Sequence, residues 1–315
     1  MSERSLLDSI CAANAALRGF GELVAVPPGD DMAALRLRRR ELLVAVDQVI
    51  EGRHFLPGTA PALIARKALC RNLSDVAAMA ASPLACVAAA TLPRSMSLAE
   101  AAALFESLRS VAASRRCPLV GGDTGTLGAV EGPLVLSVTV LAELPEGIAR
   151  PVLRRGARAG DGLFVTGALG GSFGRDGMGR HLTFEPRVAE AIELRRALGG
   201  RLHAMIDLSD GLGSDAGHLA EAAGLVARID ARALPCAPGC DWRSAYGDGE
   251  DYELCFAAEE PVPRTLLGLA VTRIGEMTPR ASPDAPPIEL LLDGAPVDPV
   301  ACGVGAGWEH RLGAP

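Results

Sequence analysis

A short apolar run that leads to an aspartate occurs three times along the chain, and this pattern constrains the fold more than any other feature. Residues 42–46 lead to Asp47, residues 119–120 lead to Gly121-Gly122-Asp123, and residues 204–206 lead to Asp207. Short apolar runs bounded by polar or glycine residues are typical of buried strands. Each run therefore predicts a strand with a carboxylate at its end, so that carboxylates from different segments can meet at one crevice.

Helical patterns lie between and after these predicted strands. Residues 61–81 and 212–223 carry apolar side chains at helical spacing. Residues 97–115 do the same and begin with Ser97 and Glu100 at the spacing of a capping box. Strands that alternate with helices, in a chain that is 49% hydrophobic but only 3% aromatic, predict an α/β (α+β) protein in which helices pack on sheets.

The chain has 315 residues, a length that suits two domains of ordinary size better than a single core. Residues 143–161 are rich in proline, glycine and arginine, which is the composition of a linker or of the entry to a domain. A new strand is predicted at residues 163–166. We therefore expect an N-terminal domain at residues 1–147 and a C-terminal α/β domain at residues 148–315.

Charge and cysteine content exclude several classes of protein. The net charge is −7 and no long run of lysine or arginine is present, so a nucleic-acid partner is not expected. The longest apolar stretch, residues 76–92, is interrupted by Ser82-Pro83 and does not predict a membrane span. The eight cysteines are scattered, and the close pair Cys236 and Cys240 has no second pair. This distribution favours reduced thiols in a cytoplasmic protein over disulfides or a zinc site.

Lys67 is the only lysine in the chain, and this limits how the protein can bind ATP. A P-loop places its lysine after a glycine-rich turn, and a protein kinase places one on a strand beside the nucleotide. Lys67 instead lies between Arg66 and Ala68 in a predicted helix. Nothing around Lys67 indicates Schiff-base chemistry with pyridoxal phosphate. Phosphate groups must therefore be bound by other means.

Aspartates dominate the polar positions near the predicted strands and helices. The set consists of Asp30, Asp31, Asp47, Asp75, Asp123, Asp207 and Asp210. Turn chemistry is the alternative role for any one of them. Together they repel one another unless they share a divalent cation, and their hard oxygen atoms favour Mg²⁺. A bound metal also lets carboxylates face phosphate groups, and Arg154 offers a fixed cation for phosphate oxygens, with a solvated linker arginine as its alternative.

The order of these polar motifs resembles that of thiamine-monophosphate kinases. The matching segments are Gly29-Asp30-Asp31, Asp47 with Glu51-Gly52-Arg53-His54-Phe55, Asn72-Leu73-Ser74-Asp75, Gly121-Gly122-Asp123-Thr124, the stretch from Arg154 to Gly160-Asp161, Asp207-Leu208-Ser209-Asp210-Gly211 and Gly249-Glu250-Asp251-Tyr252-Glu253-Leu254. A last segment, Gly307-Trp308-Glu309-His310, is similar to the C-terminal signature of that family. The resemblance covers nearly the whole chain.

The resemblance implies a two-domain fold of the aminoimidazole-ribotide-synthetase-like superfamily. In that fold the N-terminal domain binds ATP and magnesium, and the N-terminal domains of two subunits form a β-barrel in a homodimer. The β-rich residues 134–140 suit such a barrel. The implied reaction is transfer of the γ-phosphoryl group of ATP to thiamine monophosphate, which gives thiamine diphosphate, with the help of several Mg²⁺ ions.

The resemblance also implies roles for individual residues. Magnesium would be bound by Asp31, Asp47, Asp75, Asp123, Asp207 and Asp210. ATP would be contacted by Gly122, Asp123, Arg154 and Ser209, and the thiamine phosphate by His54, Glu250 and Trp308. Catalysis would depend on Asp75, Asp123, Asp210 and Arg154. The acceptor is already a phosphate oxyanion, so alignment and charge neutralisation suffice without a strong general base. A structural His54 and a core Trp308 are the alternatives at those positions.

Three features depart from the family pattern. Ala45 and Val46 stand where hydroxyl residues usually precede the aspartate, residues 170–186 are shorter than in relatives, and Asp248 and Gly125 replace a usual glycine and threonine. Two other functions therefore stay open: an ATP-dependent enzyme of the same superfamily with a different acceptor, and a non-catalytic nucleotide-binding protein. The first kind of enzyme would usually carry a reactive cysteine in a glycine-rich N-terminal segment or at the C-terminus, and neither is seen in this sequence. In the second kind of protein, six mutually repelling aspartates would destabilise the fold without serving catalysis.

Overall fold

The computed structural model describes residues 24–26, 34–35, 42–128, 131–174 and 176–304. The chain divides into two compact units, Met1–Val76 with Ser82–Leu144 and Ala77–Ala81 with Pro145–Pro315. Each unit has its own sheet and helices, so the mixed α/β class is confirmed. The division of functions at residue 148 stays a prediction. Asp31 and Trp308 lie outside the described residues.

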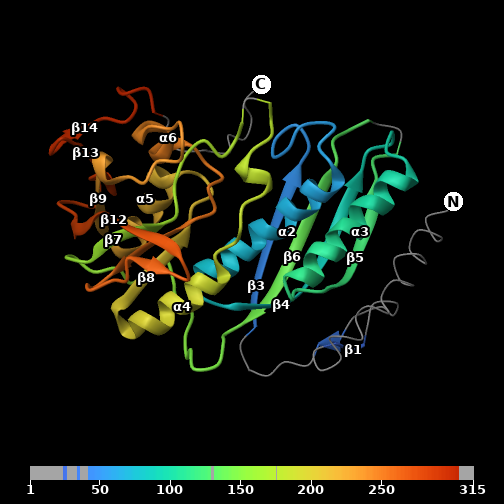
Figure 1. Ribbon diagram of the computed structural model, residues 1–315, viewed down its shortest axis with the longest axis horizontal. Helices are drawn as coiled ribbons and strands as arrows, with labels where there is room; N and C mark the ends of the chain where they lie inside the picture. Colours follow the sequence, from blue (N-terminus) through green and yellow to red (C-terminus); the bar gives the residue numbers. More distant parts are fainter. Residues whose placement is uncertain (1–23, 27–33, 36–41, 129–130, 175, 305–315) are drawn as a thin grey trace. The chain divides into compact units, whose positions relative to one another are not determined.

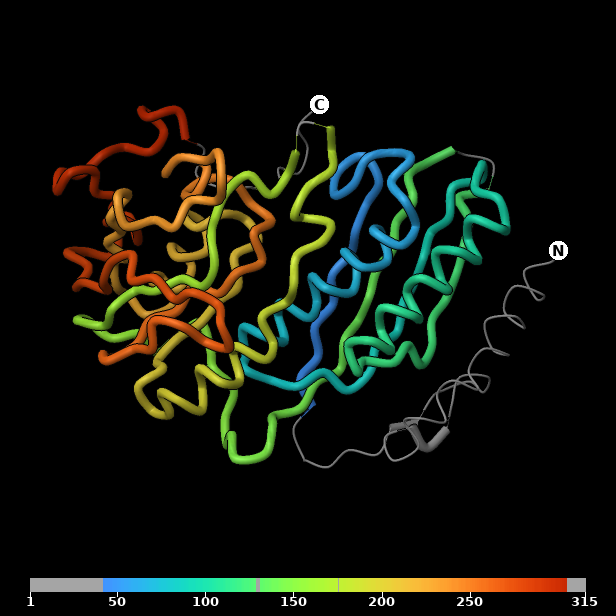
Figure 2. Tube along the Cα trace, viewed as in Figure 1, coloured from blue at the N-terminus to red at the C-terminus, as the bar shows by residue number. Residues whose placement is uncertain are grey.

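The first unit is built on a four-stranded sheet with the strand order β3-β6-β4-β5. Its elements are β1 (Val24–Val26), β2 (Ala34–Leu35), β3 (Leu43–Ile50), α2 (Pro61–Ala78), β4 (Ser82–Leu92), α3 (Leu98–Ser114), β5 (Leu119–Thr126) and β6 (Val135–Glu143). Strands β1 and β2 form a separate antiparallel pair. Figure 1 shows α2 and α3 over the same face of the four-stranded sheet. Figure 2 shows the later strand β6, in green, between the traces of the earlier β3 and β4.

The two helices predicted in this unit are present. Helix α3 begins after Ser97, whose side chain accepts a hydrogen bond from the backbone of Glu100. The Glu100 carboxylate in turn accepts a 2.8 Å hydrogen bond from the Ser97 backbone. The predicted capping box is therefore confirmed, and the buried Leu104 and Leu108 of α3 belong to the core of the unit.

Two of the three predicted strand-end aspartates lie inside their strands. Strand β3 pairs with β6 over its whole length, as far as Ile50 opposite Val135, so it continues past Asp47. Strand β5 pairs in parallel with β4 as far as Thr126, so it continues past Asp123. The predictions for Asp47 and Asp123 were wrong because a neighbouring strand supplies hydrogen-bond partners beyond the apolar run. Asp207, at the end of β8 (Leu202–Asp207), is where it was predicted.

Strand β3 also differs from the buried strand that was predicted. It lies at one edge of the sheet, and Val44 and Val46 are 61% and 65% exposed. Among the described residues the sheet is open, with β3 and β5 as its edges, and no closed barrel is formed. One face of this edge strand is therefore apolar and uncovered within a single chain.

The second unit is built on an eight-stranded sheet in the order β14-β13-β9-β12-β7-β10-β8, with β11 paired to β12. Besides β8, its elements are β7 (Gly162–Thr166), α4 (Val188–Leu198), α5 (Leu212–Ala223), β9 (Leu225–Asp230), α6 (Trp242–Gly247), β10 (Leu254–Ala258), β11 (Thr265–Leu266), β12 (Leu269–Pro279), β13 (Ile288–Leu292) and β14 (Ala295–Val297), with short 3-10 turns at Arg180–Leu182, Gly199–Arg201 and Ala231–Ala233. All neighbours are antiparallel except β13 and β9, which are parallel.

Helices cover both faces of this second sheet. On one face Val165 of β7 packs into a core that contains Leu212 and Leu219 of α5. On the other face the next residue along β7, Phe164, packs into a core that contains Leu194 of α4. Because successive residues of a strand point to opposite faces, this alternation makes the sheet the middle of three layers. No helix among the described residues is long and apolar enough to cross a membrane.

Candidate active site

The two most distinctive acidic motifs of the second unit are hydrogen-bonded to each other. The last strand pair of β8 and β10 places Leu254 opposite Asp207. Beyond it, the backbone N–H of Tyr252 donates to Leu208 and the N–H of Glu250 donates to Ser209, both at 2.8 Å. The segment 249–254 therefore runs antiparallel beside the segment 207–211. This arrangement places Glu250 beside Ser209, two residues to which the motifs assign substrate and nucleotide contacts.

This pairing requires an unusual backbone at two positions. Glu250 and Tyr252 have φ values of 63° and 51°, in the left-handed region that side chains other than glycine rarely adopt. Gly249 allows close approach, since a Cβ atom there would lie 2.8 Å from the Ser209 carbonyl oxygen. Strained conformations of this kind persist where the surrounding structure holds them, and they cluster at functional sites.

The Glu250 carboxylate is held by a histidine from the short segment 170–186. Its Oε2 lies 3.2 Å from Nδ1 of His181, whose side chain is fully buried. The other ring nitrogen of His181 lies 3.1 Å from the carbonyl oxygen of Gly177. His181 was not singled out from the sequence, because a single histidine in a glycine-rich stretch carries no signal of its own.

Asp215, in the first turn of α5, organises the segment that carries Ser209 and Asp210. Its Oδ2 accepts hydrogen bonds from the backbone N–H groups of Ser209 at 2.9 Å and Asp210 at 3.0 Å. Burial, with repulsion from Asp207 and Asp210, raises the pKa of Asp215 to about 8. Asp215 was not singled out from the sequence, although it follows Asp210-Gly211, where a carboxylate in the first turn of a helix is favoured.

Two further carboxylates of the motif 249–254 are buried and structural. Asp251 accepts hydrogen bonds from the Gly170 N–H at 3.0 Å, from Ser172 Oγ at 2.6 Å and from Arg180 at 2.6 Å. Burial raises the pKa of Asp251 to about 6, while Ser172, Gly170 and Arg180 oppose that rise.

The second of these carboxylates, Glu253, is paired with Arg187 and also accepts a 2.7 Å hydrogen bond from Thr166. Arg180 lies in the short segment before α4, and Arg187 directly precedes the first residue of α4. The segment 170–187 is thus fastened to the acidic motif through buried ion pairs. Paired carboxylate and arginine residues separated by more than sixty positions give no recognisable spacing in the sequence.

In the first unit, Asp47 and Asp75 are associated with helix α2. Asp47 is ion-paired with Arg71 of α2 at 3.6 Å, and Arg71 also donates to the Gln48 carbonyl. Asp75 lies one turn further along α2 and is partly exposed. Asn72, which lies between Arg71 and Asp75 in α2, is fully buried and donates to the Ala68 carbonyl at 3.0 Å. This part of α2 is therefore fastened to β3 beside Asp47.

The sheet register separates Asp123 from Asp47. Asp47 stands in a row with Val138, and in the neighbouring pairs Val138 is opposite Ala88 and Ala88 is opposite Gly122. Asp123 therefore belongs to the adjacent row, and adjacent rows of a sheet point to opposite faces. Asp123 is exposed. The structure does not bring these two predicted ligands together within the first unit.

His54 lies in the connection between β3 and α2. Its Nδ1 accepts a 2.9 Å hydrogen bond from the Ile50 backbone N–H, which places the ring proton of neutral His54 on Nε2. The fully buried Lys67 donates to the His54 carbonyl at 2.6 Å. The position of His54 is thus set by its own loop and by the only lysine of the chain.

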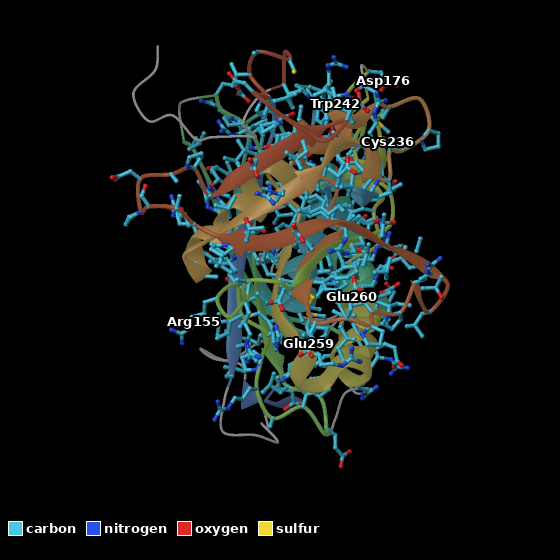
Figure 3. All side chains as sticks on the ribbon, turned by 90° about the vertical axis from the view of Figure 1, so that its left-hand side faces the viewer. Arg155, Asp176, Cys236, Trp242, Glu259 and Glu260 are labelled. Carbon is cyan, nitrogen blue, oxygen red and sulfur yellow. The ribbon has the colours of Figure 1, made fainter. Side chains whose placement is uncertain are left out.

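The two remaining predicted nucleotide contacts have simple surroundings. Gly122 allows β5 to approach β4, because a Cβ atom at this position would lie 2.1 Å from the Ala88 carbonyl oxygen. Arg154 is exposed, and its neighbour Arg155 also extends from the ribbon in Figure 3. Sheet packing is thus sufficient to explain Gly122, whereas nothing in the packing requires an arginine at position 154.

A cavity of about 490 Å³ lies in the first unit, next to the segment that carries His54. Its lining includes Glu51, Glu100 and Glu131 beside Phe55 and Ile64, but none of the predicted site residues. Each of these carboxylates accepts a hydrogen bond within the unit. Glu51 accepts from the Leu134 backbone N–H and Glu131 from the Ser95 hydroxyl. Glu100 belongs to the capping box of α3. The acidic lining is therefore explained by the local structure.

No group of three or more His, Cys, Asp or Glu residues within the described part of the chain is arranged to hold a metal ion. Asp207 and Asp210 are nevertheless close enough to Asp215 to raise its pKa, which shows that like charges crowd this end of the second sheet. The predicted ligand set, of which Asp31 lies outside the described residues, stays a prediction.

Comparisons with known proteins identify relatives of this chain. Residues 29–144 match the family described as AIR synthase related protein, N-terminal domain. The thiamine-monophosphate kinase of Salmonella typhimurium is 36% identical over 303 residues, which cover 85% of this chain and 88% of that protein. The corresponding protein of Rhodopirellula baltica is 34% identical and covers 82% and 84%.

Solved structures show the same similarity. The crystal structure of thiamine-monophosphate kinase from Stenotrophomonas maltophilia K279a superposes with a TM-score of 0.75 at 31% identity, over 93% of this chain and 97% of that chain. A structure of AaThiL complexed with AMPPCP and TMP superposes with a TM-score of 0.71 at 26% identity, over 95% and 96% of the two chains. The similarity therefore extends through both units.

Proposed function

This chain belongs to the thiamine-monophosphate kinase family, and from that premise we propose that it transfers the γ-phosphoryl group of ATP to thiamine monophosphate, forming thiamine diphosphate and ADP. AaThiL, which is similar over 95% of this chain, has been crystallised with AMPPCP and TMP. A nucleotide triphosphate analogue and the monophosphate acceptor are the two ligands that such a reaction requires. The proposal assigns both ligand types to this chain.

The observation that carries the proposal is the hydrogen bond from the Glu250 N–H to the Ser209 carbonyl. Ser209 is assigned to ATP and Glu250 to the thiamine phosphate, so donor and acceptor ligands would bind to two backbone segments that are bonded side by side. Asp215 holds the first segment through two N–H groups, and Asp251 holds the second through Arg180 and Ser172. Both segments are therefore held by internal hydrogen bonds, and precise placement of reacting groups is a large part of phosphoryl-transfer catalysis.

The reaction needs no covalent enzyme intermediate. An oxygen of the thiamine monophosphate forms a bond to the γ-phosphorus, the bond from that phosphorus to the β–γ bridging oxygen breaks, and ADP leaves with the released electron pair. We assign to His54 a contact with the acceptor phosphate, as the family resemblance implies; its Nδ1 accepts a hydrogen bond from Ile50. Arg154 would balance phosphate charge. Trp308 is assigned to the thiamine phosphate by the family resemblance alone.

The carboxylate oxygen atoms of the predicted aspartate ligands suit magnesium. Mg²⁺ is usually bound by one or two carboxylates together with substrate phosphates, so the absence of a larger described ligand group is compatible with it. We assign Asp207 and Asp210 to this role in the second unit, and Asp47, Asp75 and Asp123 in the first; Asp31 completes the family set. When bound, the ions would neutralise phosphate charge and relieve the repulsion among these carboxylates.

We further propose a homodimer in which the first units of two chains meet through their open sheets and complete a barrel. The exposed Val44 and Val46 on the edge strand β3 support this, because paired apolar side chains on an uncovered sheet face are typical of an interface. The cytoplasmic location stays a prediction of the sequence.

A coupled assay of ADP release tests the main proposal. Purified protein is mixed with ATP at several magnesium concentrations, with and without thiamine monophosphate, and the organic product is separated by chromatography. We expect ADP release that requires both thiamine monophosphate and magnesium, with one thiamine diphosphate formed per ADP. ADP release that is independent of the acceptor, or no release under any condition, would overturn the proposal.

A further inference from the structure

Phe173 is an exposed aromatic residue beside the candidate site. It lies in the loop after β7, and 47% of its surface is exposed. A phenylalanine in water loses the free energy that burial of its ring would contribute. Its position therefore needs an explanation.

The ring of Phe173 is held in place by a buried partner. It stacks on the imidazole of His181 with the ring centroids 4.3 Å apart and an angle of 28° between the ring planes. His181 is itself fixed at both edges, by Glu250 at Nδ1 and by the Gly177 carbonyl at Nε2. The exposed Phe173 ring and the Glu250 carboxylate thus both contact the same buried imidazole.

Hydrogen bonds hold the loop that carries Phe173, both before the phenylalanine and after it. Gly171 donates its N–H to Asp248 at 2.8 Å, and Ser172 bonds to the buried Asp251 at 2.6 Å. On the far side, the His181 N–H donates to the Ser172 carbonyl at 3.0 Å. Asp248, which departs from the family pattern, therefore has a role in holding this loop. Phe173 therefore lies in a loop that several hydrogen bonds hold in place, which favours a role of its exposed ring in ligand recognition.

We propose that Phe173 and Glu250 form two sides of a subsite for a flat, nitrogen-bearing aromatic ring, which in the proposed substrate is the aminopyrimidine of thiamine monophosphate. Phe173 supplies a face for stacking, and Glu250 accepts a hydrogen bond from the exocyclic amine. His181 acts as a positioning residue for both. This inference rests on the proposed function, and within the short segment 170–186 it assigns Phe173 alone to substrate recognition.

The test compares Phe173→Ala with Phe173→Tyr, which keeps an aromatic face. Loss of the stacking surface should raise KM for thiamine monophosphate by roughly 2- to 10-fold, while KM for ATP and kcat stay close to those of the parent. Phe173→Tyr should restore most of the affinity. Met178→Ala is the matched control, because Met178 is an exposed apolar residue, 43% exposed, in the same loop; its kinetics should equal those of the parent.

A truncated acceptor separates ring recognition from loop structure. The phosphate ester of the hydroxyethylthiazole alone lacks the aminopyrimidine, so parent and Phe173→Ala should phosphorylate it with equal kcat/KM. Isothermal titration with thiamine monophosphate should show the same loss of affinity as the kinetics. Parent protein that neither binds nor phosphorylates thiamine monophosphate would overturn the proposed function and this inference with it. An active parent whose Phe173→Ala variant has unchanged KM, or loses activity equally on both acceptors, would overturn the inference alone.

Discussion

The ammonium group of Lys67 donates a 2.6 Å hydrogen bond to the backbone carbonyl of His54, although Lys67 is fully buried. A lysine is almost never fully buried unless its charge is paired or hydrogen-bonded. The bond connects helix α2 to the loop that carries the residue assigned to the acceptor phosphate. The only lysine of the chain, which has no place in a P-loop or protein-kinase site, therefore supports the candidate site indirectly.

Replacement of this lysine should weaken the acceptor site. Lys67→Met fills a similar volume but leaves the His54 carbonyl without its donor, so we expect unfolding free energy to fall by about 1–3 kcal/mol. KM for thiamine monophosphate should rise while KM for ATP stays close to that of the parent. A double-mutant cycle with His54→Ala checks the route: once His54 is absent, Lys67→Met should have little further effect on KM. Equal effects in both backgrounds would show that Lys67 does not act through His54.

Asp75→Asn should nearly abolish turnover and leave the fold intact. Asp75 is partly exposed on α2, so the isosteric change costs little stability, whereas loss of a charged metal ligand should lower kcat at least about 100-fold. Steady-state kinetics and a thermal melt provide the measurements. Glu106→Gln on α3 is the control, since Glu106 pairs only with its neighbour Arg109 among the described residues. Parent-like turnover by Asp75→Asn would contradict the metal role.

Two substitutions of Asp215 distinguish the effect of its charge from the effect of its hydrogen-bond acceptor oxygen. Asp215→Ala leaves the N–H groups of Ser209 and Asp210 without their acceptor, and kcat/KM for ATP should fall roughly 10- to 100-fold. Asp215→Asn keeps an acceptor oxygen and should remain within about 3-fold of the parent. Ser214→Ala, at the preceding, partly exposed position of α5, is the control. Equal losses in the Asn and Ala variants would assign Asp215 a role as a charged ligand instead.

Stability should depend on pH through Asp251. Its pKa is raised to about 6 by burial, so between about pH 4 and 6 the folded state binds more protons than the unfolded state. The unfolding free energy therefore falls as the pH rises through this interval, by a total of about 3 kcal/mol relative to a variant that cannot titrate. Urea unfolding of the parent and Asp251→Asn across this interval and above it measures the difference. A difference that does not change with pH would contradict this assignment.

The oligomeric state should depend on the open sheet. Placing carboxylates at Val44 and Val46 by the double change Val44→Asp and Val46→Asp should convert a dimer to a monomer, because burying these charges in an apolar interface is costly. Light scattering at micromolar concentration measures the mass. Val300→Asp is the control, since Val300 is 68% exposed and belongs to the second unit. Parent protein that is already monomeric would argue against the barrel dimer.

Local patterns in the sequence were sufficient for helices α2, α3 and α5, but α4 and α6 were not predicted. The Ser97 and Glu100 spacing predicted the start of α3, and the apolar periodicity after Gly211 predicted α5, which spans Leu212–Ala223. Such features depend on residues three or four positions apart, so the chain carries the information in one short window. The motif order was sufficient for the family, because each motif is itself a short local segment.

Tertiary structure decided everything that depends on partners distant in the sequence. Strand β3 passes Asp47 because β6 pairs with it, and the register that separates Asp47 from Asp123 is set by the intervening strands. Glu250 meets His181 because the antiparallel pairing of β7 and β10 places the loop after β7 beside the segment before β10. The sequence by itself determined helices α2, α3 and α5 and the family. Which of the site residues share a face, a hydrogen bond or a buried charge was decided by strand pairing, since pairing between distant segments leaves no spacing that a single sequence reveals.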